Sequence, residues 1–117
     1  MALRATYREA AGVTVVDIGG RITLGEGSAL LRKTIRELLE DQRTMILLNL
    51  ADVDYIDSSG IGELARIYVA VVKHGGAMKV IGLTPKVEEV LKITHLSQVF
   101  QEFPDEQSAL RSFPAIP

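Results

Sequence analysis

The stretch ILLNLADVDYIDSSGIGELARI, residues 46–67, runs from an apolar segment through a polar turn into an amphipathic segment. Residues 45–50 are nearly continuously apolar and have polar neighbours, which predicts a central strand covered on at least one face. From residue 61 onward, apolar residues recur at third and fourth positions, which predicts a helix. The turn between the two elements holds three neighbouring polar residues: Asp57, Ser58 and Ser59.

The segments before this stretch predict a hairpin and a first helix. Apolar and polar residues alternate over residues 3–9 and 13–18, and Ala11-Gly12 between them is a turn sequence. After several glycines, residues 28–41 carry apolar side chains at helical spacing. The sheet therefore begins with two antiparallel strands, and its third strand follows a helix.

The segments after the stretch continue the alternation of strands and helices. Residues 78–83 alternate as a strand, and Thr84-Pro85 is a typical helix start, because threonine caps free amides and proline fits the first helical position. A weaker strand is predicted at residues 99–103, and a short helix at residues 105–111 with Asp105 as its cap.

The element order β-β-α-β-α-β-α-β-α predicts a single α/β domain over residues 1–111. Its mixed sheet starts with the hairpin and carries about four helices. The periodicity alone does not fix whether the helices cover one face of the sheet or both. The proline-containing end, residues 112–117, is expected to fray.

Composition narrows the range of functions. The 117 residues are 47% hydrophobic and 24% charged, as in one globular domain. A net charge of −2 supplies no basic patch for nucleic acid and no polybasic membrane anchor. The chain has no cysteine and no apolar run of the roughly 20 residues that a membrane span needs, so we expect a cytoplasmic protein without membrane insertion. A protein partner or a small ligand fits this composition best.

The polar turn has a purely structural interpretation. Aspartate and serine are favoured helix caps, because their side-chain oxygens accept hydrogen bonds from unpaired helix amides. One cap needs one oxygen, and the sequence leaves open whether Asp57, Ser58 or Ser59 supplies it. Gly60 and Gly62 follow in the first helical turns, where glycine costs roughly 1 kcal/mol relative to alanine. We expect the close approach of another molecule to offset that cost.

A second interpretation of the turn is a switch by charge. A helix N-terminus favours phosphate, and a serine there is a natural phosphate acceptor. Phosphorylation would add about −1.5 to −2 units of charge beside Asp57. That charge is enough to disrupt a docking surface by repulsion while the fold stays in place.

Other chemistries fit the sequence less well. The serines lack the flanking glycines of a nucleophile elbow, and the only candidate bases, His74 and His95, stand in no recognisable context. Without a histidine or cysteine cluster, neither a metal site nor a cofactor is predicted. The loop at residues 20–27 lacks the lysine of a phosphate-binding loop, which favours a turn, and whether it contacts a nucleotide or a partner stays open.

Residues 46–67 closely resemble the signature of the STAS domain, and specifically of bacterial anti-sigma factor antagonists: an apolar strand, the turn D-x-x-x-x-D-S-S-G-x-G and an amphipathic helix. The segment KHGGAMKVIGLTPKVEEVLKITHLSQVF, residues 73–100, also matches the family. The likeness is looser over the first hairpin, and after it Thr23 stands where many members carry aspartate.

The resemblance implies helices packed mainly on one face of the sheet. It implies that Ser58 is phosphorylated by the cognate anti-sigma factor, a serine kinase with a histidine-kinase-like ATPase domain, and that a PP2C-type phosphatase removes the phosphate. The unphosphorylated antagonist binds the anti-sigma factor and frees the sigma factor. Asp57 matches the acidic residue beside the acceptor, and the turn that follows is matched by Ser59, Gly60 and Gly62.

The helix after Ser58 is expected to bury a stripe formed by Ile61, Leu64, Ala65, Tyr68 and Val72. Glu63 and Arg66 then point outward, with Ile67 at the border, within two turns of the serine. The partner-binding surface predicted from this projection comprises Asp57, Ser58, Ser59, Gly60, Gly62, Glu63, Arg66 and Ile67.

The leading hypothesis is a non-enzymatic anti-sigma factor antagonist, a monomer or weak homodimer, that regulates transcription and is switched off by phosphorylation of Ser58. A second hypothesis keeps the fold but makes the chain a STAS subunit of a larger, stressosome-like scaffold or of a lipid-transport complex, without phosphate turnover. A third is a small hydrolase that uses Ser58 or Ser59 as its nucleophile.

Overall fold

The computed structural model describes residues 3–114, which form a five-stranded sheet and four α-helices. In chain order the elements are β1 (Arg4–Ala10), β2 (Val13–Ile22), α1 (Glu26–Glu40), β3 (Met45–Ile56), α2 (Ser58–Lys73), β4 (Ala77–Ile81), α3 (Pro85–Ile93), a short 3₁₀ helix (Leu96–Gln98), β5 (Glu102–Phe103) and α4 (Glu106–Ser112). The predicted order of strands and helices is confirmed.

The sheet is mixed, and its strands lie side by side in chain order. β1 pairs antiparallel with β2, whereas β2 to β5 pair parallel. At the hairpin turn, Ala11 and Gly12 have φ angles of 52° and 80°, because a two-residue turn needs positive φ to match the twist of its strands. Since β2 and β3 are parallel, their carboxyl ends meet at one edge of the sheet, where α1 and α2 begin.

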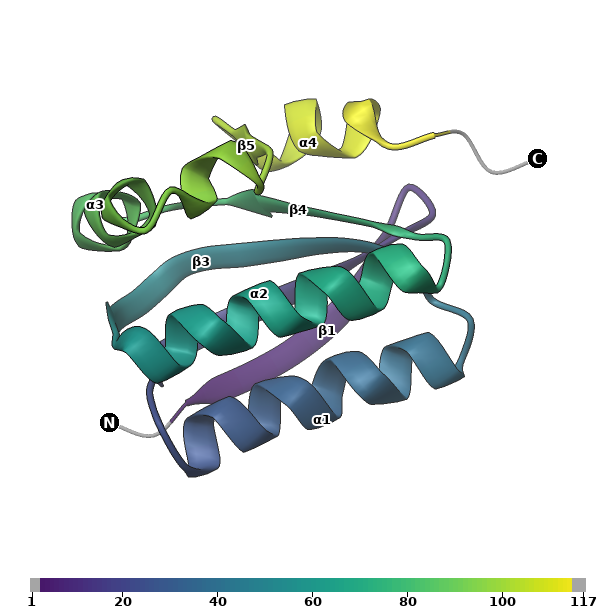
Figure 1. Ribbon diagram of the computed structural model, residues 1–117. Coiled ribbons are helices and arrows are strands. Elements are labelled where there is room, and N and C mark those ends of the chain that lie inside the picture. The colour runs from purple at the N-terminus through teal and green to yellow at the C-terminus, as the bar shows by residue number, and fades with distance from the viewer. Residues whose placement is uncertain (1–2, 115–117) are drawn as a thin grey trace.

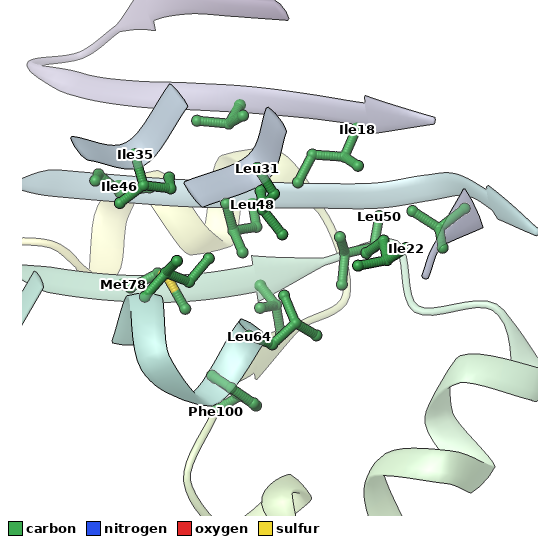
Figure 2. Packing of buried hydrophobic residues seen from close by; sticks show 14 of the residues in the cluster. Ile18, Ile22, Leu31, Ile35, Ile46, Leu48, Leu50, Leu64, Met78 and Phe100 are labelled. Atoms are coloured by element: carbon green, nitrogen blue, oxygen red, sulfur yellow. The ribbon is translucent and has the colours of Figure 1, made fainter. Parts of the chain in front are cut away.

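The main core lies between the sheet and the helices of one face. Figure 1 shows α1 and α2 side by side across the sheet. Leu31 and Ile35 of α1 and Leu64 of α2 belong to one buried cluster with Ile46 and Leu48 of β3, as Figure 2 shows. Buried residues of α3 join the same cluster. The expectation that the helices pack mainly on one face is therefore confirmed for three of the four helices.

α4 is the exception, because it packs on the opposite face of the sheet. There Ala109 and Phe113 form a second buried cluster with Val13, Val15, Leu47 and Ile81. Lys79 Nζ also donates a hydrogen bond to the carbonyl oxygen of Ser112, at 3.0 Å. Ser112 and Phe113, which the sequence assigns to the tail, thus contact the sheet, and residues 115–117 lie outside the described part of the chain.

Three strands differ in length by three residues or more from those predicted. β2 continues four residues past the predicted end at residue 18, to Ile22. β3 continues to Ile56, because Val53 and Ile56 are buried in the core while Asp52 and Asp54, on either side of Val53, face solvent. The last strand is shorter than predicted, since β5 comprises only Glu102–Phe103. None of the helices formed by residues 3–114 has the length and apolarity that a membrane span requires.

Candidate functional site

The turn between β3 and α2 is held by the side chain of Asp57. This residue has an extended backbone and occupies the N-cap of α2, where its Oδ1 accepts a hydrogen bond from the Gly60 amide at 2.8 Å. Ser58 is the first residue of the helix and is exposed, whereas Ser59 is half-buried. Of the three residues considered as caps, Asp57 takes that role, so the Ser58 side chain is not used as the cap.

Asp57 also ties this turn to the loop after β2. Its Oδ2 accepts a hydrogen bond from the Leu24 amide at 3.3 Å, and its own amide donates to the carbonyl oxygen of Ile22 at 3.3 Å. Part of the glycine-rich loop between β2 and α1 is thus fixed against the start of α2. Gly25, in the same loop, precedes α1 with a φ of 97°, a conformation that favours glycine.

The two glycines of α2 have different surroundings. A Cβ atom on Gly60 would overlap the carbonyl oxygen of Ile22 and lie 2.8 Å from Cγ1 of Ile56. The chain's own backbone occupies the space at Gly60, so the expectation of another molecule there is wrong. A Cβ atom on Gly62 would meet only the end of the Arg66 side chain, at 3.5 Å or more, so its surface is open.

A groove lies between the first turns of α1 and α2, and Ser58 stands in its wall. The groove has a volume of about 410 Å³. We call it the Ser58 groove, and its lining consists of Leu24, Gly25, Ser28, Ala29, Arg32, Ser58, Ser59, Gly62 and Arg66. It contains two cationic side chains, one from each helix. Ser58, Ser59, Gly62 and Arg66 of the predicted surface come together here.

Glu63 does not point outward as predicted, because it is fully buried between α1 and α2. Its Oε1 accepts hydrogen bonds from Nη2 of Arg32 at 2.7 Å and, more weakly, from Nη2 of Arg66 at 3.4 Å. The two arginine side chains are 53% and 64% exposed, so an inner carboxylate anchors two outer guanidinium groups. We call Arg32 and Arg66 the arginine pair, and Glu63 its anchor.

The predicted buried stripe of α2 is rotated by about one residue. Ile67, placed at the border, is buried, and Val72, placed inside, is 49% exposed. Because α2 packs against both the sheet and α1, its buried arc turns toward α1 and includes Gly60, Glu63 and Val71. Because Glu63 was expected to face solvent, Arg32 was not predicted as a site residue. The position of Glu63 next to an apolar stripe could have indicated a cationic partner, since a buried carboxylate needs a cation.

Two opposing effects set the pKa of Glu63. Burial of its carboxyl acts to raise the pKa, but the hydrogen bonds and charge of Arg32, followed by those of Arg66, outweigh burial. The pKa of Glu63 is therefore held below its usual value. The carboxylate stays ionised, and the anchor persists in mildly acidic solution.

This pKa predicts an acid-dependent loss of stability. In the unfolded chain Glu63 regains its ordinary pKa, about 4.5, and so binds a proton at a higher pH than in the native state. Because the unfolded state then binds more protons, the unfolding free energy falls as the pH drops through and below this value. Urea unfolding at a series of pH values measures the slope. Glu63→Gln should flatten it, and an unchanged slope would contradict the assignment.

The hydrolase alternative would need a histidine base beside Ser58. His74 follows the last residue of α2, a helix of 16 residues that spans roughly 24 Å. His95 is exposed and precedes the 3₁₀ helix, and neither histidine lines the Ser58 groove. Over residues 3–114, no group of three or more His, Cys, Asp or Glu residues is arranged to hold a metal ion.

Comparison with known proteins identifies related chains. The family described as STAS domain matches residues 4–109. The chain is 27% identical over 100 residues to the anti-sigma F factor antagonist of Paenibacillus polymyxa, covering 85% of each protein. It is 30% identical over 84 residues to the anti-sigma-B factor antagonist of Bacillus subtilis (strain 168), covering 72% of this chain and 75% of the relative.

Solved structures share the fold. A crystal structure of an anti-sigma factor antagonist from Mycobacterium paratuberculosis superposes with a TM-score of 0.81 at 23% identity, covering 96% of this chain and 94% of the other. The phosphorylated form of the Bacillus cell fate determinant SpoIIAA superposes with a TM-score of 0.70 at 16% identity, covering 92% and 98%. At these identities the likeness shows the fold alone.

Proposed function

The chain belongs to the STAS domain family, in the branch of the anti-sigma factor antagonists, and on that premise we propose that it binds an anti-sigma factor and is released by phosphorylation of Ser58. In this proposal the partner is a serine kinase with a histidine-kinase-like ATPase domain, and a PP2C-type phosphatase restores the unmodified protein. The chain itself performs no catalysis.

One observation carries the proposal: Ser58 is an exposed residue that lines a groove, while hydrogen bonds hold the backbone around it in place. Asp57 caps the helix and holds the loop after β2, so Ser58 is presented on a defined backbone. A kinase needs such access to transfer the terminal phosphoryl group of ATP to the serine oxygen. Ser59 is half-buried and Gly60 is buried, which makes Ser58 the better acceptor of the two serines.

The proposed switch acts through charge. A phosphoryl group at Ser58 would bring about −1.5 to −2 units of charge to a surface that already holds the Asp57 carboxylate. The fold has no need to move, because the helix cap belongs to Asp57 and is unaffected by modification of the neighbouring hydroxyl. A partner that docks over the start of α2 would then meet repulsion and the cost of desolvating the phosphate.

The proposed contact surface follows the exposed groups of the predicted set. Asp57, Ser58, Ser59, Gly62 and Arg66 lie where a partner can reach them. The other three predicted residues are buried and act from inside: Gly60, Glu63 and Ile67. Glu63 contributes by holding Arg66 of α2 and Arg32 of α1 in place.

Phosphate mapping tests this function. The purified protein is incubated with ATP and the kinase-like anti-sigma factors encoded in the same genome, and the modified residue is located by mass spectrometry. We expect one phosphate on Ser58 in the wild type and in Ser59→Ala, and none in Ser58→Ala.

The absence of phosphate on Ser58 with every such kinase would contradict the proposal. A stable complex that forms without phosphate turnover would then favour the scaffold alternative.

A further inference from the structure

We propose that Arg32 and Arg66 form a built-in receptor for the phosphoryl group carried by Ser58. The inference rests on the proposed function in one respect, namely that Ser58 is the residue modified. It goes further by assigning the phosphate a site on the chain's own surface, made by two residues of different helices.

The position of the arginines supports this assignment. Both guanidinium groups line the Ser58 groove together with Ser58 itself. The Arg66 side chain folds back along α2, with its Nη1 only 3.5 Å from where a Cβ of Gly62 would lie. Gly62 is one helical turn beyond Ser58, so the absence of a side chain there leaves the path between the serine and the guanidinium open.

The hydrogen-bond donors of the two arginines are only partly used. Arg32 donates to Glu63 through Nε and Nη2, and Arg66 donates to it through Nη2 alone. Among contacts within residues 3–114, Nη1 of Arg32 and both Nε and Nη1 of Arg66 have no hydrogen-bond partner. A guanidinium has five N–H donors, and phosphate is an ideal acceptor for those that remain.

The charge balance of the groove also favours a phosphate. Glu63 offsets one of the two positive charges, which leaves a net charge of about +1 beside the positive end of the α2 dipole. Asp57 adjoins Ser58 in the chain, but both of its carboxylate oxygens already accept hydrogen bonds from backbone N–H groups. The anchor also limits the freedom of the arginines before any phosphate arrives, so less entropy is lost on capture.

Capture of the phosphate would also change the charge available in a second groove on the same face. A more apolar groove of about 410 Å³ runs between α1 and α2 over Ile35, Leu39 and Ala70, and its lining includes Arg32 and Arg66. Once both guanidinium groups pair with phosphate, they are no longer available to an acidic group of a docked partner. Phosphorylation would thus remove attraction as well as add repulsion.

A titration of the phosphate tests the inference without any kinase. Phosphoserine is incorporated genetically at position 58 of the full chain, and its second ionisation, near pH 6 in a free phosphoserine, is followed by ³¹P NMR. We expect the double variant Arg32→Gln/Arg66→Gln to bind the phosphate proton about tenfold more tightly than the wild type, because two charge-assisted hydrogen bonds to the dianion are lost. Glu63→Gln should instead lower the pKa of the phosphate, because it removes the negative charge that offsets one of the two arginines.

Lys73→Gln is the matched control, since Lys73 is a cation of the same helix that lines neither groove. An equal shift in this control and in the double variant, or no shift in either, would overturn the inference. Inorganic phosphate added to the unmodified protein separates the two sources of the ligand. We expect no arginine-dependent spectral change at millimolar concentration, and saturable binding would make the groove a site for free phosphate instead.

Discussion

A Gly60→Ala variant is expected to lose about 2 kcal/mol of unfolding free energy, although alanine favours helices more than glycine does. The helical gain is about 1 kcal/mol, whereas forcing a methyl group into a filled space costs about 3 kcal/mol when the surroundings cannot relax. Here the obstacle is the carbonyl oxygen of Ile22 in β2, which also accepts a hydrogen bond from the Asp57 amide. Urea unfolding at neutral pH measures the loss.

Gly62→Ala is the control, because it makes the same change two residues further along α2. Its methyl group would meet only the flexible end of Arg66, so the helical preference for alanine should prevail and raise the stability by up to about 1 kcal/mol. The two substitutions should therefore have opposite signs. A loss of equal size at both positions would mean that helical glycine itself, and not the contact with β2, is what the fold requires.

Features that depend on neighbouring residues were predictable from the sequence. The hairpin turn at Ala11-Gly12 and the cap and first residue of α3, Thr84 and Pro85, lie where the local patterns indicate. The cap of α4 by Asp105 is also confirmed, through its bond to the Ser108 amide at 2.8 Å. Each of these follows from backbone preferences that act within a few residues.

Features that depend on distant parts of the chain were not predictable in the same way. The sequence of α2 alone cannot show that Glu63 is buried, because the cation that makes burial tolerable, Arg32, lies 31 positions earlier on α1. Nor can it show that Gly60 faces the backbone of Ile22, since that contact follows from how β2 and β3 pair. A helix that packs against two neighbours, as α2 does against the sheet and α1, buries a different face from the one its apolar stripe alone predicts.

The candidate site also has a part that follows from local sequence and a part that follows from tertiary packing. The resemblance to the family indicated Ser58, and in the structure Ser58 is an exposed residue next to the Asp57 cap. The groove next to it required the packing of α1 on α2, which brings Arg32 and Ala29 opposite the serines. A local motif can indicate a candidate acceptor residue, but the surface that a partner would meet is made by tertiary contacts.

Charge at Ser58 is expected to control partner binding, and Ser58→Asp should weaken the complex with the anti-sigma factor at least tenfold. The aspartate brings a permanent negative charge to the first residue of α2, next to Asp57. Its carboxylate also offers the arginine pair a hydrogen-bond acceptor, although one with less charge and fewer oxygens than a phosphate. Isothermal titration calorimetry or surface plasmon resonance with the partner identified by phosphate mapping gives the two dissociation constants.

Ser58→Asn is the matched control for this prediction, because asparagine has nearly the same shape as aspartate but no charge. Both side chains suit a helix N-terminus, so thermal unfolding should differ little between the two variants. We expect Ser58→Asn to bind within about threefold of the wild type, since the docking surface keeps its charge. Equal weakening by the two variants would show that the partner reads the size of the side chain, and the proposed gating by charge would be wrong.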